Sequence, residues 1–373
     1  MTTLDVEVAI PTSPKDPVNR AILEVSEDQI KGFVRDPVFE IAHRSGIDGP
    51  IVVERIQAML RAGVVRRVRQ TLLATNLAQG ALVAWKIGAE RLDGAFDFLS
   101  KRDPFSGHVV IRNSEFGSTA WPLWTTLKVP TGFSIEKHCE FLRKQIGAEK
   151  YRIMPALRAF VLGVGHMRRK GMRIGEKADQ PAMDMVPAIV DLDERDWRVL
   201  VELKRDLEVD EVGHGLWERR ALEAGIDPES FLEVAESLDR RGVIGRFSTF
   251  LEHTKPVGDA NERLSSFNGL FHWAVPKGRE IEAGREIGRF AILTHCYWRD
   301  AGPELDNVNI MAVAHGETKD EVLAHKAAID RYLVDSGIGC NYTHVYWGGR
   351  AEIKPSEISP IAYRNWARMN GVV

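Results

Sequence analysis

The chain contains one pattern of residues twice, with the two copies lying about 180 residues apart. Gly63-Val-Val-Arg-Arg67-Val corresponds to Gly242-Val-Ile-Gly-Arg246-Phe at an offset of 179 residues. Further along, His108-Val-Val-Ile-Arg112 corresponds to His295-Cys-Tyr-Trp-Arg299 at an offset of 187 residues. Repetition of a whole unit favours two similar folds related by a pseudo-twofold axis. The sequence therefore predicts an internal pseudo-dimer and leaves further homo-oligomerisation open.

Length and composition limit the classes of protein to consider. At 373 residues the chain is too long for one small core, so we expect several domains. The net charge of −3 provides no global basic field of the kind that drives non-specific DNA binding. Three cysteines without C-x-x-C spacing argue against a disulfide framework and fit a reducing compartment. No signal-peptide pattern and no apolar run of about 18 residues occurs, so we expect a cytoplasmic protein that does not span a membrane.

The first copy begins with a helix-turn-helix pattern. Residues 1 to about 20 hold three prolines and no periodicity, which predicts a mobile lead-in. Apolar residues at helical spacing over 38–61, interrupted by a Gly-containing break at 45–49, predict two helices. Gly63 ends the second helix, and the Val- and Leu-rich stretch 64–73 predicts a wing hairpin.

A second kind of unit follows, and both kinds then recur. In the first copy, strands are expected at 81–85, 108–111, 121–129 and 151–162, and helices at 90–100 and 134–146. This β-α-β-β-α-β order predicts a ferredoxin-like sandwich in which the helices cover one sheet face and leave the other for a ligand or partner. The second copy repeats the plan with helices at 192–203, 228–241, 280–287 and 320–334, a wing from Gly242, and strands at 268–275, 291–298, 308–313 and 340–347.

The predicted architecture is an α+β tandem repeat of a winged helix-turn-helix plus a ferredoxin-like sandwich. The expected boundaries are winged helix 1 at 20–78, ferredoxin-like domain 1 at 79–167, a linker at 168–188, winged helix 2 at 189–256, ferredoxin-like domain 2 at 257–352 and a tail at 353–373. The tail carries Tyr363, Trp366 and Arg368, and we expect these side chains to dock on a neighbouring surface.

This plan resembles that of the Lrp/AsnC regulators, and three motifs resemble the siroheme decarboxylases, an enzyme branch built on the same plan. Those enzymes carry a wing of the type G-V-I-R-R-F, a strand H-C-Y-x-R, and a stretch W-P-Y-N-L-x-x-M-V-H-G. The matching segments here are 242–247, 295–299 and 309–316, and Trp121-Pro-Leu123 matches the start of the third motif in the first copy. The resemblance covers nearly the whole chain. It implies decarboxylation of the acetate side chains of an iron-containing tetrapyrrole in haem or haem d1 biosynthesis, with no further cofactor required.

The two copies differ within these motifs. Val110 stands where the second copy has Tyr297. Aligned by their letters, Leu123 replaces Asn309, and Val129 replaces His315. On this resemblance the second half is expected to keep the fuller site, and the first half to be structural or accessory.

A siroheme-type ligand is a flat macrocycle with many carboxylates, so its site needs an apolar slot and several cationic donors. Arginine binds carboxylates bidentately through its planar guanidinium. Arg246 and Arg299 are therefore predicted clamps for the substrate, with Arg67 and Arg112 as their counterparts in the first copy. The alternative is that these arginines form weak surface ion pairs.

His295 and Tyr297 are two residues apart, so on a strand both point to one face, and Arg299 shares that face. Loss of a carboxylate leaves carbanion character that must be protonated, and an imidazole or a phenol can deliver the proton. We therefore predict His295 and Tyr297 as catalytic, with Asn309, His315 and His108 as further substrate contacts. The alternative is that His295 and Tyr297 are satisfied core residues and that His315 bonds a backbone carbonyl at a strand end.

No spacing typical of a protein-bound metal, such as H-E-x-x-H, occurs in the sequence. The sequence gives no reason to prefer His253, His272 or His344 as a ligand.

Two other classes of function remain open. A DNA-binding regulator is favoured by the helix-turn-helix and by the arginines at 55–69. It is disfavoured by the second recognition helix, because Glu229, Glu233, Glu236 and Asp239 would repel phosphates. A tetrapyrrole-binding sensor without chemistry would use the same slot, and the sequence does not separate it from an enzyme.

Overall fold

The computed structural model describes residues 10–163, 165, 167, 171–252, 257 and 267–372. They form two compact units, each built from both copies of the repeat. Unit 1 draws on Met1–Leu73, Gly165–Lys170 and Leu192–Leu264, and unit 2 on Ala74–Val164, Gly171–Asp191 and Ser265–Val373. The two helix-turn-helix segments therefore fold together in unit 1, and the two sandwich segments fold together in unit 2.

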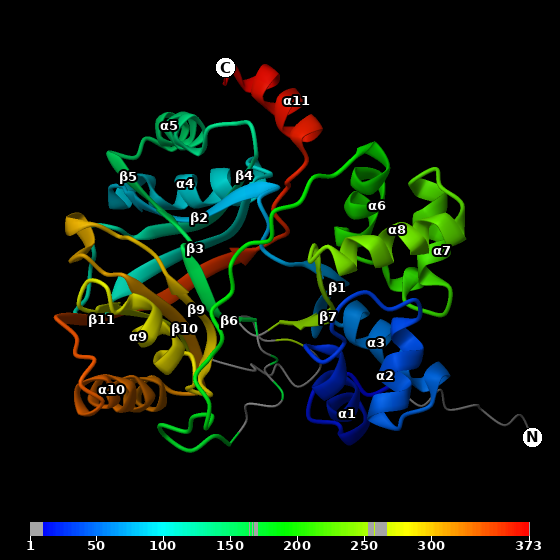
Figure 1. Ribbon diagram of the computed structural model, residues 1–373, viewed down its shortest axis with the longest axis horizontal. Helices are drawn as coiled ribbons and strands as arrows, with labels where there is room; N and C mark the ends of the chain where they lie inside the picture. Colours follow the sequence, from blue (N-terminus) through cyan, green and yellow to red (C-terminus); the bar gives the residue numbers. More distant parts are fainter. Residues whose placement is uncertain are drawn as a thin grey trace, which may run out of the picture. The chain divides into compact units, whose positions relative to one another are not determined.

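Unit 1 is helical apart from its two wing strands. Its helices are α1 (Pro17–Ser26), α2 (Pro37–Ser45), α3 (Gly49–Arg61), α6 (Glu194–Lys204), α7 (Leu216–Glu223) and α8 (Pro228–Arg240), with a short 3₁₀ turn η2 (Val209–Glu211) (Figure 1). An aspartate at the N-cap accepts backbone N–H bonds at the start of α1, α2, α3, α6 and α8. After α3 and α8, Gly63 and Gly242 adopt φ of 71° and 73°, which turns the chain into each wing.

Two helices of unit 1 were not predicted. Helix α1 lies partly in the stretch expected to be a mobile lead-in, because Asp16 caps it, Pro17 starts it, and Ile22 and Leu23 are fully buried. Helix α7 has a buried face that includes Trp217. The expectation of a mobile segment was therefore wrong from residue 17 onward, and residues 1–9 lie outside the described ranges.

The predicted wing hairpins do not form. Each wing is a single strand, β1 (Val65–Leu72) or β7 (Ile244–Leu251), and the two pair antiparallel with each other. The stretch 65–72 contains no Gly, Pro, Asn or Asp that would start a tight turn, so it runs on as one strand. Its backbone finds partners in the equivalent strand of the other copy, and Val68 and Phe247 are buried.

Unit 2 contains the predicted β-α-β-β-α-β order twice, which confirms the fold class. The first copy comprises β2 (Ala78–Lys86), α4 (Ala89–Lys101), β3 (Ser106–Ser114), β4 (Leu123–Pro130), α5 (Ile135–Ile146) and β5 (Lys150–Pro155). The second comprises β8 (Phe267–Ala274), α9 (Glu280–Ile287), β9 (Leu293–Trp298), β10 (Ile310–Gly316), α10 (Lys319–Asp335) and β11 (Tyr342–Ile353).

One antiparallel sheet joins the two copies, in the order β5-β2-β4-β3-β11-β8-β10-β9-β6 (Figure 1). Strand β6 (Arg158–Leu162) was predicted to continue β5 as one strand, and that prediction was wrong. Strand β5 ends at Pro155, which has no N–H to donate, and β6 pairs with β9 at the other end of the sheet. The end of each copy thus reaches the other copy. Strand β11, the last of the second copy, pairs with β3 of the first, and β6, which follows β5 of the first copy, pairs with β9 of the second.

The sheet has two apolar faces with different partners. On the outer face, α4 and α5 cover the first copy around Trp85, and α9 and α10 cover the second around Trp273. The inner face carries a third cluster, which includes Trp124, Leu270 and Met311. Side chains alternate between the faces along each strand, so the position of a residue in its strand decides which face it joins.

The C-terminal tail forms α11 (Pro360–Asn370), which docks as expected. Tyr363 and Trp366 are buried in the outer cluster of the first copy, and the Trp366 ring stacks on that of His138 with 4.5 Å between centroids. Arg368 is exposed, so its predicted docking was wrong: it lies on the face of α11 away from the buried side chains.

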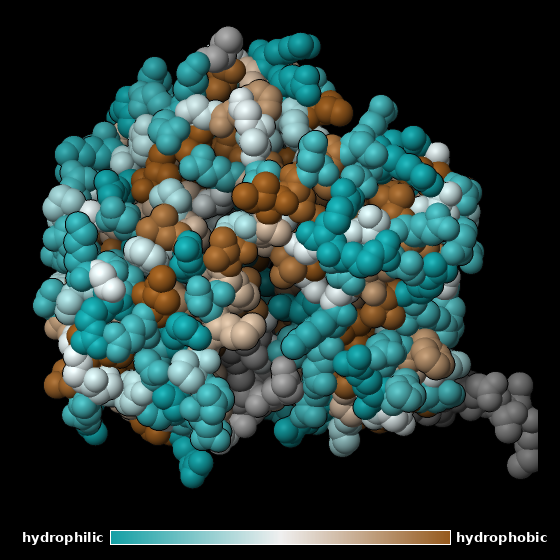
Figure 2. Space-filling view, in the orientation of Figure 1, coloured by the Kyte–Doolittle hydropathy of each residue, from teal (hydrophilic) through white to brown (hydrophobic). Residues whose placement is uncertain are grey.

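Hydrophilic residues cover most of the surface seen in Figure 2, and hydrophobic residues form separate patches. Within the described ranges, none of the helices combines the length and the hydrophobicity needed to span a bilayer.

Candidate functional site

His295 and Tyr297 lie side by side on the inner face of β9. They pair with Val313 and Met311 of β10, which belong to the inner apolar cluster, whereas Cys296 between them is buried in the outer cluster. The two rings are stacked, with 6.1 Å between centroids and 18° between planes. Both residues are of intermediate exposure. The shared face predicted from their spacing is therefore present.

Arg299 contacts Tyr297 and has partners on two sides. Its Nη1 donates a 2.6 Å hydrogen bond to the carbonyl oxygen of Met154, and its Cζ lies 4.5 Å from the centre of the Tyr297 ring. Burial lowers the pKa of Arg299 to about 10, so the side chain stays charged at neutral pH. Burial raises the pKa of Tyr297, and the adjacent Arg299 acts against that rise. This geometry suits orientation of the phenol better than capture of an external carboxylate.

The amide of Asn309 is engaged by the backbone. Its Nδ2 donates to the carbonyl oxygen of Val275 at 2.9 Å, and its Oδ1 accepts from the Val275 N–H at 2.8 Å. Asn309 thus fastens the start of β10 to the end of β8. We leave it out of the substrate contacts, because both ends of the amide already have partners.

The strand ladders also correct the matching of the third motif between copies. Leu123 pairs with Trp85, and Ile310 pairs with Trp273, the buried tryptophan at the same place in the second copy. Leu123 is therefore equivalent to Ile310 and not to Asn309. Matching by letters was wrong by one residue, because the residues just before β4 and β10 lie outside the ladders and do not define the register.

The same shift makes Lys128, rather than Val129, the counterpart of His315. His315 lies on the inner face of β10, two residues beyond Val313, and is partly exposed. It stands directly opposite Asn268 of β8. The inner face of the second copy thus carries His295 and His315 on adjacent strands.

The first copy offers a reduced version of the β9 arrangement. On β3, His108 is exposed, Val110 takes the place of Tyr297, and Arg112 is buried. Arg112 Nη1 donates to the Oδ1 of Asn268 in the second copy at 3.2 Å. The side chains of His108 and Arg112 therefore have different surroundings, and no phenol lies between them.

Two histidines that the sequence did not rank lie on the inner face near this contact. His344 of β11 bonds Glu115 through Nδ1 and Ser114 through Nε2, both at 3.1 Å. His272 of β8 is 1% exposed, and its Nε2 has no hydrogen-bond partner among the described residues. Alternation along β8 indicates an inward side chain, but the sequence alone could not show that the inner face is packed there. His253 lies outside the described residues.

His272 should make the protein sensitive to acid. Burial, followed by the charges of His344, Arg112 and Lys326, holds its pKa well below the usual value. As the pH falls below about 6.5, the unfolded chain takes up a proton that the folded chain refuses, so stability is lost on acidification at up to ~1.4 kcal/mol per pH unit. We expect His272→Leu to remove this part of the acid dependence of the free energy of unfolding.

Urea unfolding at a series of pH values from neutral down to about 5 would measure the effect. His43→Leu, at an exposed position, provides the matched control for the loss of one imidazole, and the slope should change more in His272→Leu than in this control. An unchanged slope in His272→Leu would show that His272 takes up its proton in the folded state.

Each wing arginine has a contact within unit 1. Arg67 lies 3.7 Å from the carboxylate of Asp206, and Arg246 donates through Nε to the carbonyl oxygen of Glu27 at 3.2 Å. Burial lowers the pKa of Arg246. Arg67 and Arg246 belong to unit 1 and the β9 residues to unit 2, so the predicted clamp set is divided between the units.

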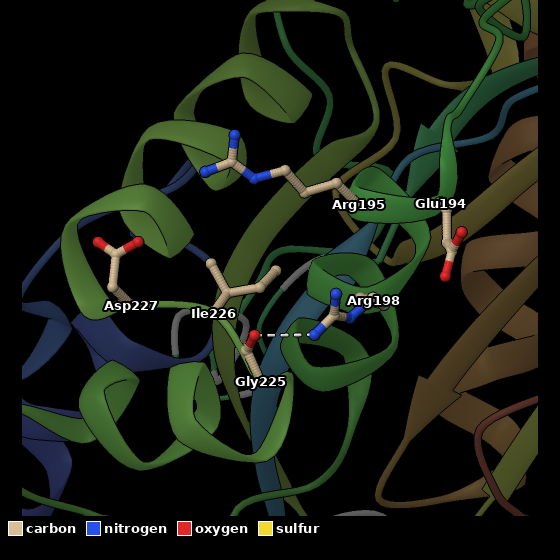
Figure 3. A pocket seen from close by; sticks show the side chains of 6 residues that line it. All are labelled: Glu194, Arg195, Arg198, Gly225, Ile226 and Asp227. Atoms are coloured by element: carbon tan, nitrogen blue, oxygen red, sulfur yellow. Dashed lines mark hydrogen bonds between the residues drawn. The ribbon is translucent and has the colours of Figure 1, made fainter.

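Unit 1 also contains a shallow pocket of about 450 Å³ (Figure 3). Arg198 in its wall donates to the carbonyl oxygens of Ala224 and Gly225, each at 2.8 Å from one of its nitrogens, at the end of α7. Its lining contains none of the predicted site residues and consists of Glu194, Arg195, Arg198, Gly225, Ile226 and Asp227. We attribute this hollow to the helix ends that meet there.

Comparisons with known proteins agree with the repeated fold. Residues 77–160 and 265–335 match the model of the AsnC-like ligand binding domain. A siroheme decarboxylase of Hydrogenobacter thermophilus is 25% identical over 325 residues, which cover 84% of this chain and 89% of that protein. The crystal structure of the siroheme decarboxylase NirDL superposes with a TM-score of 0.65 at 19% identity, covering 95% of this chain and 98% of that one. NirDL in complex with an iron-uroporphyrin III analogue gives a TM-score of 0.64. The chain is therefore similar to siroheme decarboxylases over most of its length, and each of its two copies matches the AsnC-like ligand binding domain.

Proposed function

We propose that this protein decarboxylates acetate side chains of a siroheme-type tetrapyrrole in the formation of haem or haem d1. The observation that carries the proposal is the inner face of β9, where the rings of His295 and Tyr297 are stacked and the buried Arg299 contacts the Tyr297 ring. The curated relative is named a siroheme decarboxylase, and the structural neighbour NirDL was crystallised with an iron-uroporphyrin III analogue. Both support a tetrapyrrole as the ligand.

The reaction breaks the bond between the acetate methylene carbon and its carboxylate carbon. Carbon dioxide leaves, and the electron pair stays on the methylene carbon, where the conjugated macrocycle can delocalise it. A proton then adds to that carbon and completes a methyl group. The protein must therefore hold the carboxylate in place and deliver one proton to a defined atom.

His295 and Tyr297 have different roles in delivering this proton. Imidazole exchanges protons near neutral pH, so His295 is the proposed donor to the new methyl group. The raised pKa of Tyr297 keeps its phenol protonated, which suits a hydrogen-bond donor to the substrate or a second acid. Arg299 fixes the phenol from behind. The hydroxyl of Thr294, 3.1 Å from Nδ1 of His295, holds the imidazole.

The test is incubation of the purified protein with siroheme under reducing, anaerobic conditions, with mass analysis of the product. We expect a product that has lost carbon dioxide from acetate groups and that carries a deuterium in each new methyl group when the solvent is D₂O. Unchanged siroheme with a visible spectral shift would instead indicate a sensor. Salt-dependent, sequence-selective DNA binding without turnover would indicate a regulator.

A further inference from the structure

Four strands from the two copies form a row of neighbouring positions on the inner face of unit 2. Arg112 of β3 is opposite Gly348 of β11. Trp347 is opposite Gly269, so Gly348 lies next to Asn268 of β8, and Asn268 is opposite His315 of β10. The row therefore connects an arginine of the first copy with a histidine of the second.

The Arg112 side chain spans part of this row. It crosses β11 and donates from Nη1 to the Oδ1 of Asn268 at 3.2 Å. Gly348, the residue under this path, has no side chain to obstruct it. A Cβ at Gly348 would lie only 3.2 Å from the Cβ of Asn268 and 3.3 Å from its Oδ1. The close approach of Arg112 to the strand next to His315 thus depends on a glycine at this position.

Arg112 is a buried charge with little compensation. It is 6% exposed, its bonded partner is a neutral amide, and its Nε has no hydrogen-bond partner among the described residues. Within those residues no carboxylate lies at ion-pair distance from it. Burial lowers its pKa to about 10, so it stays protonated at neutral pH. An isolated buried guanidinium is costly unless an anion completes its surroundings.

The equivalent arginine of the second copy, Arg299, has different surroundings. Arg299 has its Nη1 on a backbone carbonyl and its guanidinium against Tyr297, whereas Val110 gives Arg112 no ring to rest on. Neither arginine has a carboxylate at ion-pair distance among the described residues, but Arg299 has a carbonyl and a ring as partners, whereas Arg112 has only the amide of Asn268. The position of Arg112 on the inner face next to the His315 strand indicates where an anion would be.

We propose that Arg112 of the first copy, reaching over Gly348, binds a peripheral carboxylate of the tetrapyrrole beside His315, so that the two copies build one composite site. This inference rests on the proposed function. It assigns Arg112 a substrate-binding role in the second copy's site, although the first copy has Val110 in place of the phenol.

The test compares siroheme binding by wild-type protein, Arg112→Met and Arg112→Lys, followed by the absorbance change on titration. We expect the Kd of Arg112→Met to rise at least about tenfold, because a charge-assisted bidentate contact is lost. Arg112→Lys should recover part of the affinity. At saturating siroheme, kcat should stay within a few-fold of wild type, because Arg112 binds the substrate and does not move the proton.

Arg350 provides the matched control. It lies two residues beyond Gly348 on β11, but the register shift between Gly348 and Ala351 breaks the alternation, and its side chain pairs with Asp93 and Asp97 of α4 on the outer face. Arg350→Met should keep the wild-type Kd. Thermal melting separates binding from structure: removal of an uncompensated charge should leave the Tm of Arg112→Met equal or higher, whereas a structural role would lower it.

Two outcomes would overturn the inference in different ways. Wild-type protein that binds and decarboxylates siroheme, with an unchanged Kd in Arg112→Met, would refute the role of Arg112 and leave the proposed function standing. Wild-type protein that does not bind siroheme would remove both. If Arg112→Met does not fold, Arg112→Lys decides the question, since an unchanged Kd there would refute recognition through the guanidinium.

Discussion

Replacing His295 with alanine should lower kcat for siroheme decarboxylation by about 10²–10⁴-fold. The expected loss reflects the need to place a proton on the methylene carbon at the moment carbon dioxide leaves. Tyr297 lies beside His295, but the raised pKa of its phenol makes it a weaker acid near neutral pH. It should therefore support only slow residual turnover. Initial rates at saturating siroheme, with product quantified by mass, would measure the effect.

The fold should survive this change, because the His295 side chain is partly exposed and belongs to neither apolar cluster of the second copy. The exposed His43 of α2 is the control, and His43→Ala should retain the wild-type kcat. Wild-type turnover in His295→Ala would exclude His295 as the donor and leave Tyr297 as the next group to change. Loss of siroheme binding without loss of kcat would make His295 a ligand contact instead.

The sequence was informative wherever a pattern has only one structural meaning. His295 and Tyr297 had to share a face on any strand, and the structure shows them stacked on β9. The β-α-β-β-α-β order followed from the change of hydrophobic period along the chain, and it occurs in both copies. The helix predicted to start at Pro228 begins at that residue, where Asp227 caps it.

Pairing between the copies could not be predicted in the same way. A β-strand pattern reads identically whether its partner belongs to the same copy or to the other one. The wing strand 65–72 was therefore assigned a local hairpin, although it pairs with 244–251. Strand 151–162 was read as continuous, although Pro155 lies at its break and the two parts join opposite ends of the sheet.

The roles of the two repeated arginines, Arg112 and Arg299, depend on such long-range neighbours. Arg299 and Arg112 occupy equivalent positions in the repeat, and the sequence treated both as clamps. Arg299 is occupied by Met154 and Tyr297 within the fold, whereas Arg112 reaches Asn268 across a glycine. The difference arises from neighbours on other strands, so the spacing of the motif could not reveal it.

A buried ion pair in unit 1 provides the largest expected effect on stability. Arg220 of α7 is fully buried, and its Nη2 donates to Glu211 at 2.6 Å and to the carbonyl oxygen of Asp206 at 2.8 Å. Its Nη1 lies 3.5 Å from Glu202. Arg220→Met would leave the buried Glu211 carboxylate with only the exposed Arg219, whose Nε lies 3.6 Å away. Removing one partner of a buried pair costs about 3–5 kcal/mol.

Arg219 is the natural control for this experiment, since it is the adjacent residue and carries the same charge. Its side chain is 53% exposed and pairs with the exposed Asp210 at 3.2 Å and, at the longer distance of 3.6 Å, with Glu211, so Arg219→Met should cost less than about 1 kcal/mol. Urea unfolding followed by far-UV circular dichroism would compare the two variants, and hydrogen exchange in α7 would locate the loss in unit 1. Because the penalty comes from an orphaned charge, adding Glu211→Gln to Arg220→Met should recover part of the stability. If the double variant is as unstable as the sum of the single ones, the two side chains are not coupled, and the cost comes from the packing around Arg220 instead.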